Sequence, residues 1–160
     1  MVILMKKTIP LVLIMLIFSA CNMRTYTPVI NEDIKLSAIY KTGDFSFSCD
    51  IVKQGGTVSI IPTSTRAKGM VISCNGKEVT FKRNKLIKTY DISELDKTNP
   101  AIILYQVFSS LDTADVKLIE NAFTYTGSCS LGKYILKQNK NNELLSLSLP
   151  SANIEIDFQT

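Results

Sequence analysis

The sequence predicts an α+β fold that is mostly β: a curled antiparallel sheet, or half-barrel, of about nine strands, with one main apolar helix covering its concave face. Three observations predict it. Apolar and polar residues alternate along most of the chain, as in strands buried on one side. Short turns separate these runs, which makes neighbouring strands antiparallel. One segment near residue 100 changes to helical spacing, and a sheet of nine strands must curl, which gives that helix a concave side to cover.

The N-terminus has the pattern of a cleaved targeting segment. Lys6 and Lys7 precede an apolar run over residues 9–18, and then come Ser19, Ala20 and Cys21. A basic pair, an apolar core and small residues before the cleavage point are what a signal peptidase requires. The alternative is a membrane-spanning anchor, but an apolar stretch of about 13 residues is short of the roughly 20 that a spanning helix needs. We therefore expect residues 1–20 to be a signal peptide, with translation starting at Met1 or Met5.

The residues around Cys21 resemble the bacterial lipobox, an apolar residue followed by two small residues and a cysteine. The resemblance implies a diacylglyceryl group on Cys21 and cleavage before it. Two or three acyl chains hold a protein stably on a membrane, where one would not. Residues 21–33 would then be the lipidated cysteine and a tether, which reaches about 40 Å when fully extended. The expected location is the extracytoplasmic face of a cell membrane.

Strands fill the first part of the mature chain. Gly55-Gly56 and Asn75-Gly76 are hairpin signals, and Asn-Gly is the stronger of the two. Alternation is clearest in Phe45, Phe47, Cys49 and Ile51, which are separated by polar residues. The predicted strands cover residues 34–40, 45–51, 57–61 and 69–74, a segment through Val79 and Phe81, and residues 86–91.

The helix is predicted to begin at Asn99 and Pro100. Asn is a good N-cap, and Pro suits the first helical position. Leu104, Val107, Phe108 and Leu111 then stand at i, i+3, i+4 and i+7, on one face of a helix. Ala101, Ile102 and Ile103 widen this face until the helix is apolar over most of its circumference. Such a helix is buried or covers an apolar surface.

Strands resume after the helix and continue to the end of the chain. The turns between them are predicted at Gly127-Ser128, at residues 139–142 and at Pro150-Ser151. The four predicted strands cover residues 116–126, 131–138, 143–149 and 152–158. With no internal repeat at a fixed period, residues 34–160 are expected to form one domain.

The composition excludes several classes of function. The chain has no His, which excludes His-based triads and imidazole metal ligands. Without Lys6 and Lys7 the chain carries 16 basic and 14 acidic side chains, a surplus of two that gives no support to nucleic-acid binding. Cys49, Cys74 and Cys129 lack a base beside them and lack metal-site spacing. We expect no catalytic residue, no metal and no cofactor. Three cysteines allow at most one disulfide, in three possible pairings. Because Cys49 is expected to be buried and free, Cys74 with Cys129 is the pairing to consider.

A basic run at Lys82, Arg83, Lys85 and Lys88 allows two interpretations. It could meet anionic lipid head groups. It could equally be a solvated hairpin edge that discourages association between sheets.

The layout of the mature chain resembles the LolA/LolB-like bacterial lipoproteins and their Gram-positive relatives. The segments that carry the resemblance are DFSFSCDI, a GG hairpin into TVSIIP, GMVISCNGKEVTF, the helix NPAIILYQVFSSL and the closing pair GKYILKQNKNNELLSLSLPSANIEIDF. The resemblance implies a LolA-like β domain, curled around a cavity that holds an acyl chain, or a scaffold of that shape with another use.

The helix and the sheet facing it supply the candidate cavity. As function, the helix is the lid of a cavity for an acyl chain or another apolar ligand in a non-enzymatic, membrane-anchored lipoprotein. As structure, it is the core partner of the sheet, and the protein is an envelope scaffold or protein-interaction module with a filled core. The candidate cavity residues are Phe45, Phe47, Ile60, Phe81, Leu104, Val107, Phe108, Leu111 and Leu136.

Overall fold

A computed structural model describes residues 33–159. The predicted signal peptide, Cys21 and almost all of the tether lie outside this range. The described residues form one antiparallel sheet and one α-helix, as the sequence predicts. The strands are β1 Ile34–Thr42, β2 Phe45–Gln54, β3 Thr57–Pro62, β4 Val71–Cys74, β5 Glu78–Arg83, β6 Leu86–Asp91, β7 Asp115–Ile119, β8 Ala122–Cys129, β9 Gly132–Asn139, β10 Leu144–Leu149 and β11 Ile154–Gln159; the helix is α2 Pro100–Ser109, and short 3-10 turns are η1 Ile92–Glu94, η2 Leu111–Thr113 and η3 Pro150–Ala152.

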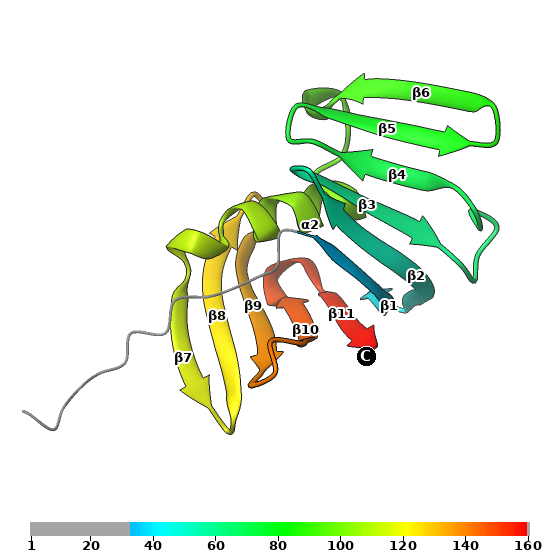
Figure 1. The fold of residues 1–160 in the computed structure, drawn as a ribbon. Coiled ribbons are helices and arrows are strands. Elements are labelled where there is room, and N and C mark those ends of the chain that lie inside the picture. Colours follow the sequence, from blue (N-terminus) through cyan, green and yellow to red (C-terminus); the bar gives the residue numbers. More distant parts are fainter. Residues whose placement is uncertain (1–32, 160) are drawn as a thin grey trace, which may run out of the picture.

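The sheet consists of two ladders of consecutive hairpins that meet in its middle. Its order is β6-β5-β4-β3-β2-β1-β11-β10-β9-β8-β7. β1 therefore pairs with β11, in a register that sets Tyr40 opposite Ile156. Figure 1 shows the resulting open sheet, with β6 at one edge and β7 at the other.

The sheet has 11 strands rather than the expected nine or so. The segment predicted as a single strand over residues 116–126 is in fact β7, a tight turn and the first part of β8. The turn is made by Glu120 and Asn121, whose φ angles are 49° and 69°. Two positive φ angles in succession are typical of the two-residue hairpin turn that matches strand twist. Glycine usually occupies such positions, and its absence hid the turn in the sequence.

The position of α2 shows how strongly the sheet curls. The helix packs against β3 and β4 on one side and against β8 on the other. Five strands separate β3 from β8 in the sheet, so a flat sheet would hold them about 29 Å apart. A helix of 10 residues is only about 15 Å long. The sheet must therefore bend around the helix, which lies in its concave side (Figure 1).

The helix forms where the sequence predicts it and for the predicted reason. The Asn99 side chain accepts a hydrogen bond from the backbone N–H of Ala101 at 3.0 Å, and Pro100 opens the first turn. The helix ends at Ser109, so Leu111 lies in the η2 turn that follows.

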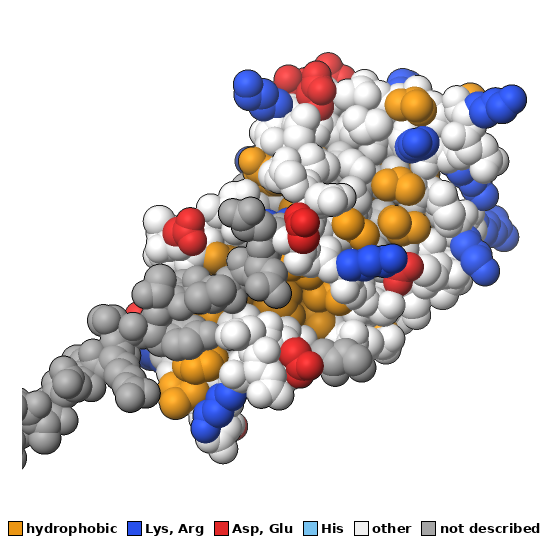
Figure 2. All heavy atoms as spheres, in the orientation of Figure 1, with side chains coloured by type: hydrophobic (Ala, Val, Ile, Leu, Met, Phe, Trp, Pro, Cys, Tyr) orange, Lys and Arg blue, Asp and Glu red, His pale blue; other side chains and the backbone are white. Residues whose placement is uncertain are grey.

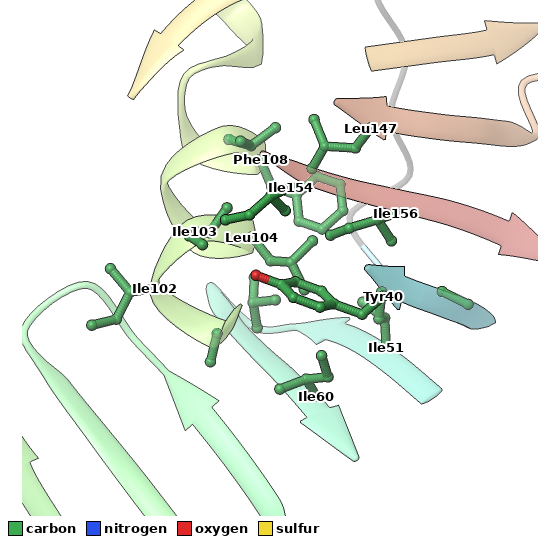
Figure 3. Close-up of a cluster of buried hydrophobic side chains, with 14 of the residues drawn as sticks. Tyr40, Ile51, Ile60, Ile102, Ile103, Leu104, Phe108, Leu147, Ile154 and Ile156 are labelled. Atoms are coloured by element: carbon green, nitrogen blue, oxygen red, sulfur yellow. The ribbon is translucent and has the colours of Figure 1, made fainter. Parts of the chain in front are cut away.

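The core lies between the helix and the concave face of the sheet. Figure 3 shows Leu104 and Phe108 of the helix beside Tyr40, Leu147 and Ile154 of the strands. The buried apolar side chains of the described range all lie between Ala38 and Phe158 and form one cluster. One continuous core therefore joins the helix and the strands of residues 33–159.

Candidate apolar binding site

The helix crosses the concave side diagonally, from the β4–β5 turn to the β8–β9 turn. At the first corner the Tyr105 ring lies over Gly76, so closely that a Cβ on Gly76 would come within 2.3 Å of the Tyr105 hydroxyl. At the second corner the Gln106 side-chain oxygen accepts hydrogen bonds from the backbone N–H and the hydroxyl of Ser130, at 3.1 and 2.7 Å. The Ser110 and Tyr134 hydroxyls are 2.9 Å apart and hydrogen-bonded in the same region. These contacts tie the helix to opposite rims of the sheet.

A diagonal helix leaves two corners of the concave side without a cover. One of them is a pocket of about 460 Å³ where β1 begins, β11 ends and β9 turns into β10. Figure 2 shows hydrophobic side chains at the surface over this part of the sheet, around β10 and β11. The lining residues are Asp33, Ile34, Lys35, Leu36, Gln138, Asn142, Glu143, Leu144, Phe158 and Gln159. We call this pocket the mouth.

The floor of the mouth is apolar and continues the core. Leu144 and Phe158 are buried, and Ile34 and Leu36 are half-buried and pack against the core cluster. Ile34 and Leu36 are on the concave face because they alternate in step with buried Ala38. The charged and amide side chains that line the mouth are exposed, except for that of Gln138. An apolar chain lying on this floor would extend the core outward.

Among residues 33–159, Gln138 is the one buried residue with a polar side chain, and it forms a wall of the mouth. Its position continues the inward-facing alternation of Tyr134 and Leu136 along β9. The Tyr125 hydroxyl donates to its side-chain oxygen, and its side-chain amide donates to the backbone carbonyl of Asn142 at 3.0 Å. Because both ends of the amide are used within the protein, Gln138 shapes the wall and does not present an unpaired group to a ligand.

The predicted cavity residues occupy three different environments. Ile60, Leu104, Val107, Phe108, Leu111 and Leu136 are buried in the core between helix and sheet. Phe47 and Phe81 are half-buried at its margins. Phe45 is on the concave face but 57% exposed, because it lies at the second uncovered corner. There it follows Phe47 and Tyr40 in a row of rings, with centroids 5.8 and 5.2 Å apart.

None of these nine residues lines the mouth. The mouth is built instead from the starts and ends of four strands. The sequence shows the apolar positions of these strands, but it does not show which of those positions the helix leaves uncovered. Gln138 was the available signal, since a polar side chain at an inward-facing position of a strand marks a place where the apolar core gives way.

The three described cysteines are free thiols. Cys49 is buried, as predicted, and burial together with the negative charge of Asp50 raises the pKa of its thiol to about 12. Burial also raises the pKa of the Cys74 thiol. A thiol with a raised pKa holds little of the thiolate that acts as nucleophile and metal ligand.

Within residues 33–159 we find no group of three or more acidic or cysteine side chains arranged to bind a metal ion. The same residues include no helix with the length and apolarity needed to cross a bilayer.

The solved structures with a distant likeness to this chain include the following two. A LolA superfamily protein from Nitrosomonas europaea is 9% identical, with a TM-score of 0.41, covering 84% of this chain and 87% of that one. A DUF1329 family protein from Desulfovibrio piger is 9% identical, with a TM-score of 0.38, covering 79% and 82%. No family model and no curated protein matches the chain. The likenesses are in fold alone.

Proposed function

We propose that this protein is a non-enzymatic lipoprotein, anchored to the membrane through Cys21, that binds an acyl chain or another apolar ligand on the concave side of its sheet. The observation that carries the proposal is the mouth. Its volume of about 460 Å³ falls within the range of roughly 300 to 1,000 Å³ that is usual for small-molecule sites. Its apolar floor and polar edge suit a ligand with an apolar chain and a polar end.

The predicted anchor and the mouth are close along the chain. The mouth is lined by Asp33, the last residue of the predicted tether, and by Ile34, the residue that follows it. A diacylglyceryl group on Cys21 would therefore hold the mouth within about 40 Å of the bilayer. At that distance the pocket could receive lipid from the membrane or deliver lipid to it.

A scaffold with a filled core is the second candidate, and one observation favours it. Ile60, Leu104, Val107 and Leu136 are completely buried, as a space filled by side chains between helix and sheet requires. In that case the mouth would be a surface recess with no ligand, and a protein partner would bind elsewhere.

Mass spectrometry of organic extracts separates the two candidates. The sample is residues 22–160, secreted with a tag, so that Cys21 and any lipid attached to it are absent. A co-purifying lipid in stoichiometric amount, together with uptake of a fluorescent fatty acid, is the expected result. A folded protein with neither property would contradict ligand binding and favour the scaffold.

A matched pair of variants tests the mouth itself. Leu36→Gln places an amide on the half-buried floor and should weaken fatty-acid binding about tenfold, because a Leu contact of this size is worth roughly 1.4 kcal/mol. Leu145→Gln makes the same change on an exposed residue outside the mouth and should leave binding unchanged. If the two changes affect fatty-acid binding equally, the mouth is not the binding site.

The anchor is tested separately in cells. Metabolic labelling with an acyl-chain probe should mark the wild-type protein, and Cys21→Ser should abolish the label. Labelling that survives Cys21→Ser would contradict the predicted attachment.

A further inference from the structure

The β5–β6 hairpin combines exposed aliphatic residues with positive charge. Leu86 is 79% exposed and Ile87 is 63% exposed, the largest values for large hydrophobic residues in the described range. They directly follow the turn at Asn84 and Lys85. The cations of the hairpin are Lys82, Arg83, Lys85 and Lys88. Residues 79–90 contain no acidic residue, and the carboxylate that acts on Lys88 is that of Glu94.

The strand register alternates the two kinds of side chain on both faces of the hairpin. Leu86 lies opposite Arg83, and Ile87 lies opposite Lys82. Leu86 and Arg83 share the concave face with buried Val79, and Ile87 and Lys82 share the convex face. Each exposed aliphatic side chain therefore has a cation beside it.

The concave face of the hairpin also carries a shallow groove. It has a volume of about 380 Å³ and is lined by Met70, Phe81 and Leu86, with Arg83, Ile87 and Lys88 around them. The Lys88 ammonium lies 4.7 Å from the centre of the Tyr90 ring. The groove thus combines four apolar side chains with two cations.

The hairpin stands at the free end of the sheet. β6 is an edge strand, and neither β5 nor β6 has more than a minor contact with the helix (Figure 1). Figure 2 shows Lys and Arg side chains along the side of the molecule formed by β3 to β6, with hydrophobic side chains among them. A flat surface could reach this end of the sheet without meeting the rest of the domain.

We propose that the β5–β6 hairpin docks on an anionic lipid surface. Leu86 and Ile87 enter the interface between head groups and acyl chains, and Lys82, Arg83, Lys85 and Lys88 contact the lipid phosphates. Aliphatic residues flanked by cations are what binds proteins to the surface of anionic membranes.

The directions of the two aliphatic side chains favour a lipid surface over a protein partner. Leu86 and Ile87 project from opposite faces of the hairpin. A partner packed in the groove would contact both residues but cover only one side chain fully, whereas a fluid interface surrounds the tip and buries both. The docking rests on the proposed function in one respect: the anchor on Cys21 keeps the hairpin within reach of a membrane.

Vesicle co-sedimentation tests the docking without the anchor. Residues 22–160, which include the complete core, are mixed with phosphatidylcholine vesicles that contain either 30 mol% phosphatidylglycerol or none. We expect the protein to bind the anionic vesicles. Binding to the neutral vesicles should be at least tenfold weaker, and 0.5 M salt should abolish binding to the anionic ones. Equal binding to both kinds of vesicle, or none to either, would overturn the proposal.

Paired variants place the binding on the hairpin. Lys85→Gln with Lys88→Gln should weaken binding to anionic vesicles about 30-fold, since each charge near such a surface is worth about fivefold. Leu86→Ser with Ile87→Ser should weaken it about tenfold or more. The control for charge is Lys133→Gln with Lys137→Gln on β9.

The apolar control is Leu118→Ser with Ile119→Ser on the opposite edge strand, where the exposed fractions are 57% and 49%. Both controls should bind like the wild type, and a loss as large as in the hairpin variants would refute the assignment. Fatty-acid uptake, measured on the same samples, should be unchanged in the hairpin variants. Docking and ligand binding can therefore fail independently of each other.

Discussion

Truncation of Phe108 tests whether the space under the helix is filled. Phe108 is 7% exposed and lies beside Leu147 and Ile154 (Figure 3). Replacing a packed Phe by Ala removes its contacts and leaves a cavity, which costs about 3–5 kcal/mol of unfolding free energy. A domain of about 130 residues is stable by roughly 10 kcal/mol, so Phe108→Ala should still fold. Its melting temperature should fall by roughly 3–6 °C for each kcal/mol lost.

Urea unfolding followed by far-UV circular dichroism measures this cost. Phe45→Ala is the matched control, because it deletes the same atoms from a ring that is 57% exposed, and it should cost less than about 1 kcal/mol. If Phe108→Ala costs no more than Phe45→Ala, the helix does not pack tightly on the sheet and the space beneath it is hollow. Phe108→Lys extends the test, since an ammonium buried in a packed core should prevent folding, whereas one facing a hollow should be tolerated.

Three further predictions concern single side chains. Gly127→Ala would place its Cβ 2.3 Å from the Tyr134 hydroxyl and should lower the free energy of unfolding in urea by about 1–3 kcal/mol. The control Ser128→Ala, on the exposed face, should change it by no more than about 0.5 kcal/mol. If Gly127→Ala has as little effect as the control, the Tyr134 ring moves freely. Maleimide at pH 8 should label the half-buried Cys129 at least tenfold faster than the buried Cys49 and Cys74. Peptide mass spectrometry measures the three labelling rates. Equal rates would mean that the core opens readily. Burial raises the pKa of the Tyr40 hydroxyl to about 12, so the unfolded chain releases this proton near pH 10 and the folded chain does not. The free energy of unfolding should therefore fall between pH 10 and 12, by at most about 2–3 kcal/mol from this group. Tyr40→Phe should make this fall with pH less steep, and an unchanged slope would contradict the prediction.

Much of the fold was predictable because local signals and the global fold agree. Asn99 and Pro100 marked the start of the helix, and the glycine-containing turns at Gly55 and Gly76 marked two hairpins. The hairpin between β7 and β8 was missed because its turn uses Glu120 and Asn121. The exposed Leu118 and Ile119 also carried the apolar run of β7 up to that turn.

The mouth was not predictable, because it depends on the path of the helix across the sheet. That path is held by contacts between residues far apart in the sequence, such as Gln106 with Ser130 and Tyr105 with Gly76. Periodicity shows that Ile34, Leu36 and Ile60 all face inward from their strands, but it does not show which of them the helix covers. Ile60 is covered, whereas Ile34 and Leu36 form the floor of an open pocket.

The pairing of β1 with β11 delays completion of the fold until the chain is almost entirely made. The first strand of the described range finds its second neighbour only in the last one, more than 100 residues later along the chain. Until β11 emerges, the ladder from β1 to β6 and the ladder from β7 to β10 share no hydrogen-bonded strand pair. Non-local pairing of this kind forms late and slowly. A chain with this strand order cannot lock into its final shape before its last strand is free to pair with its first.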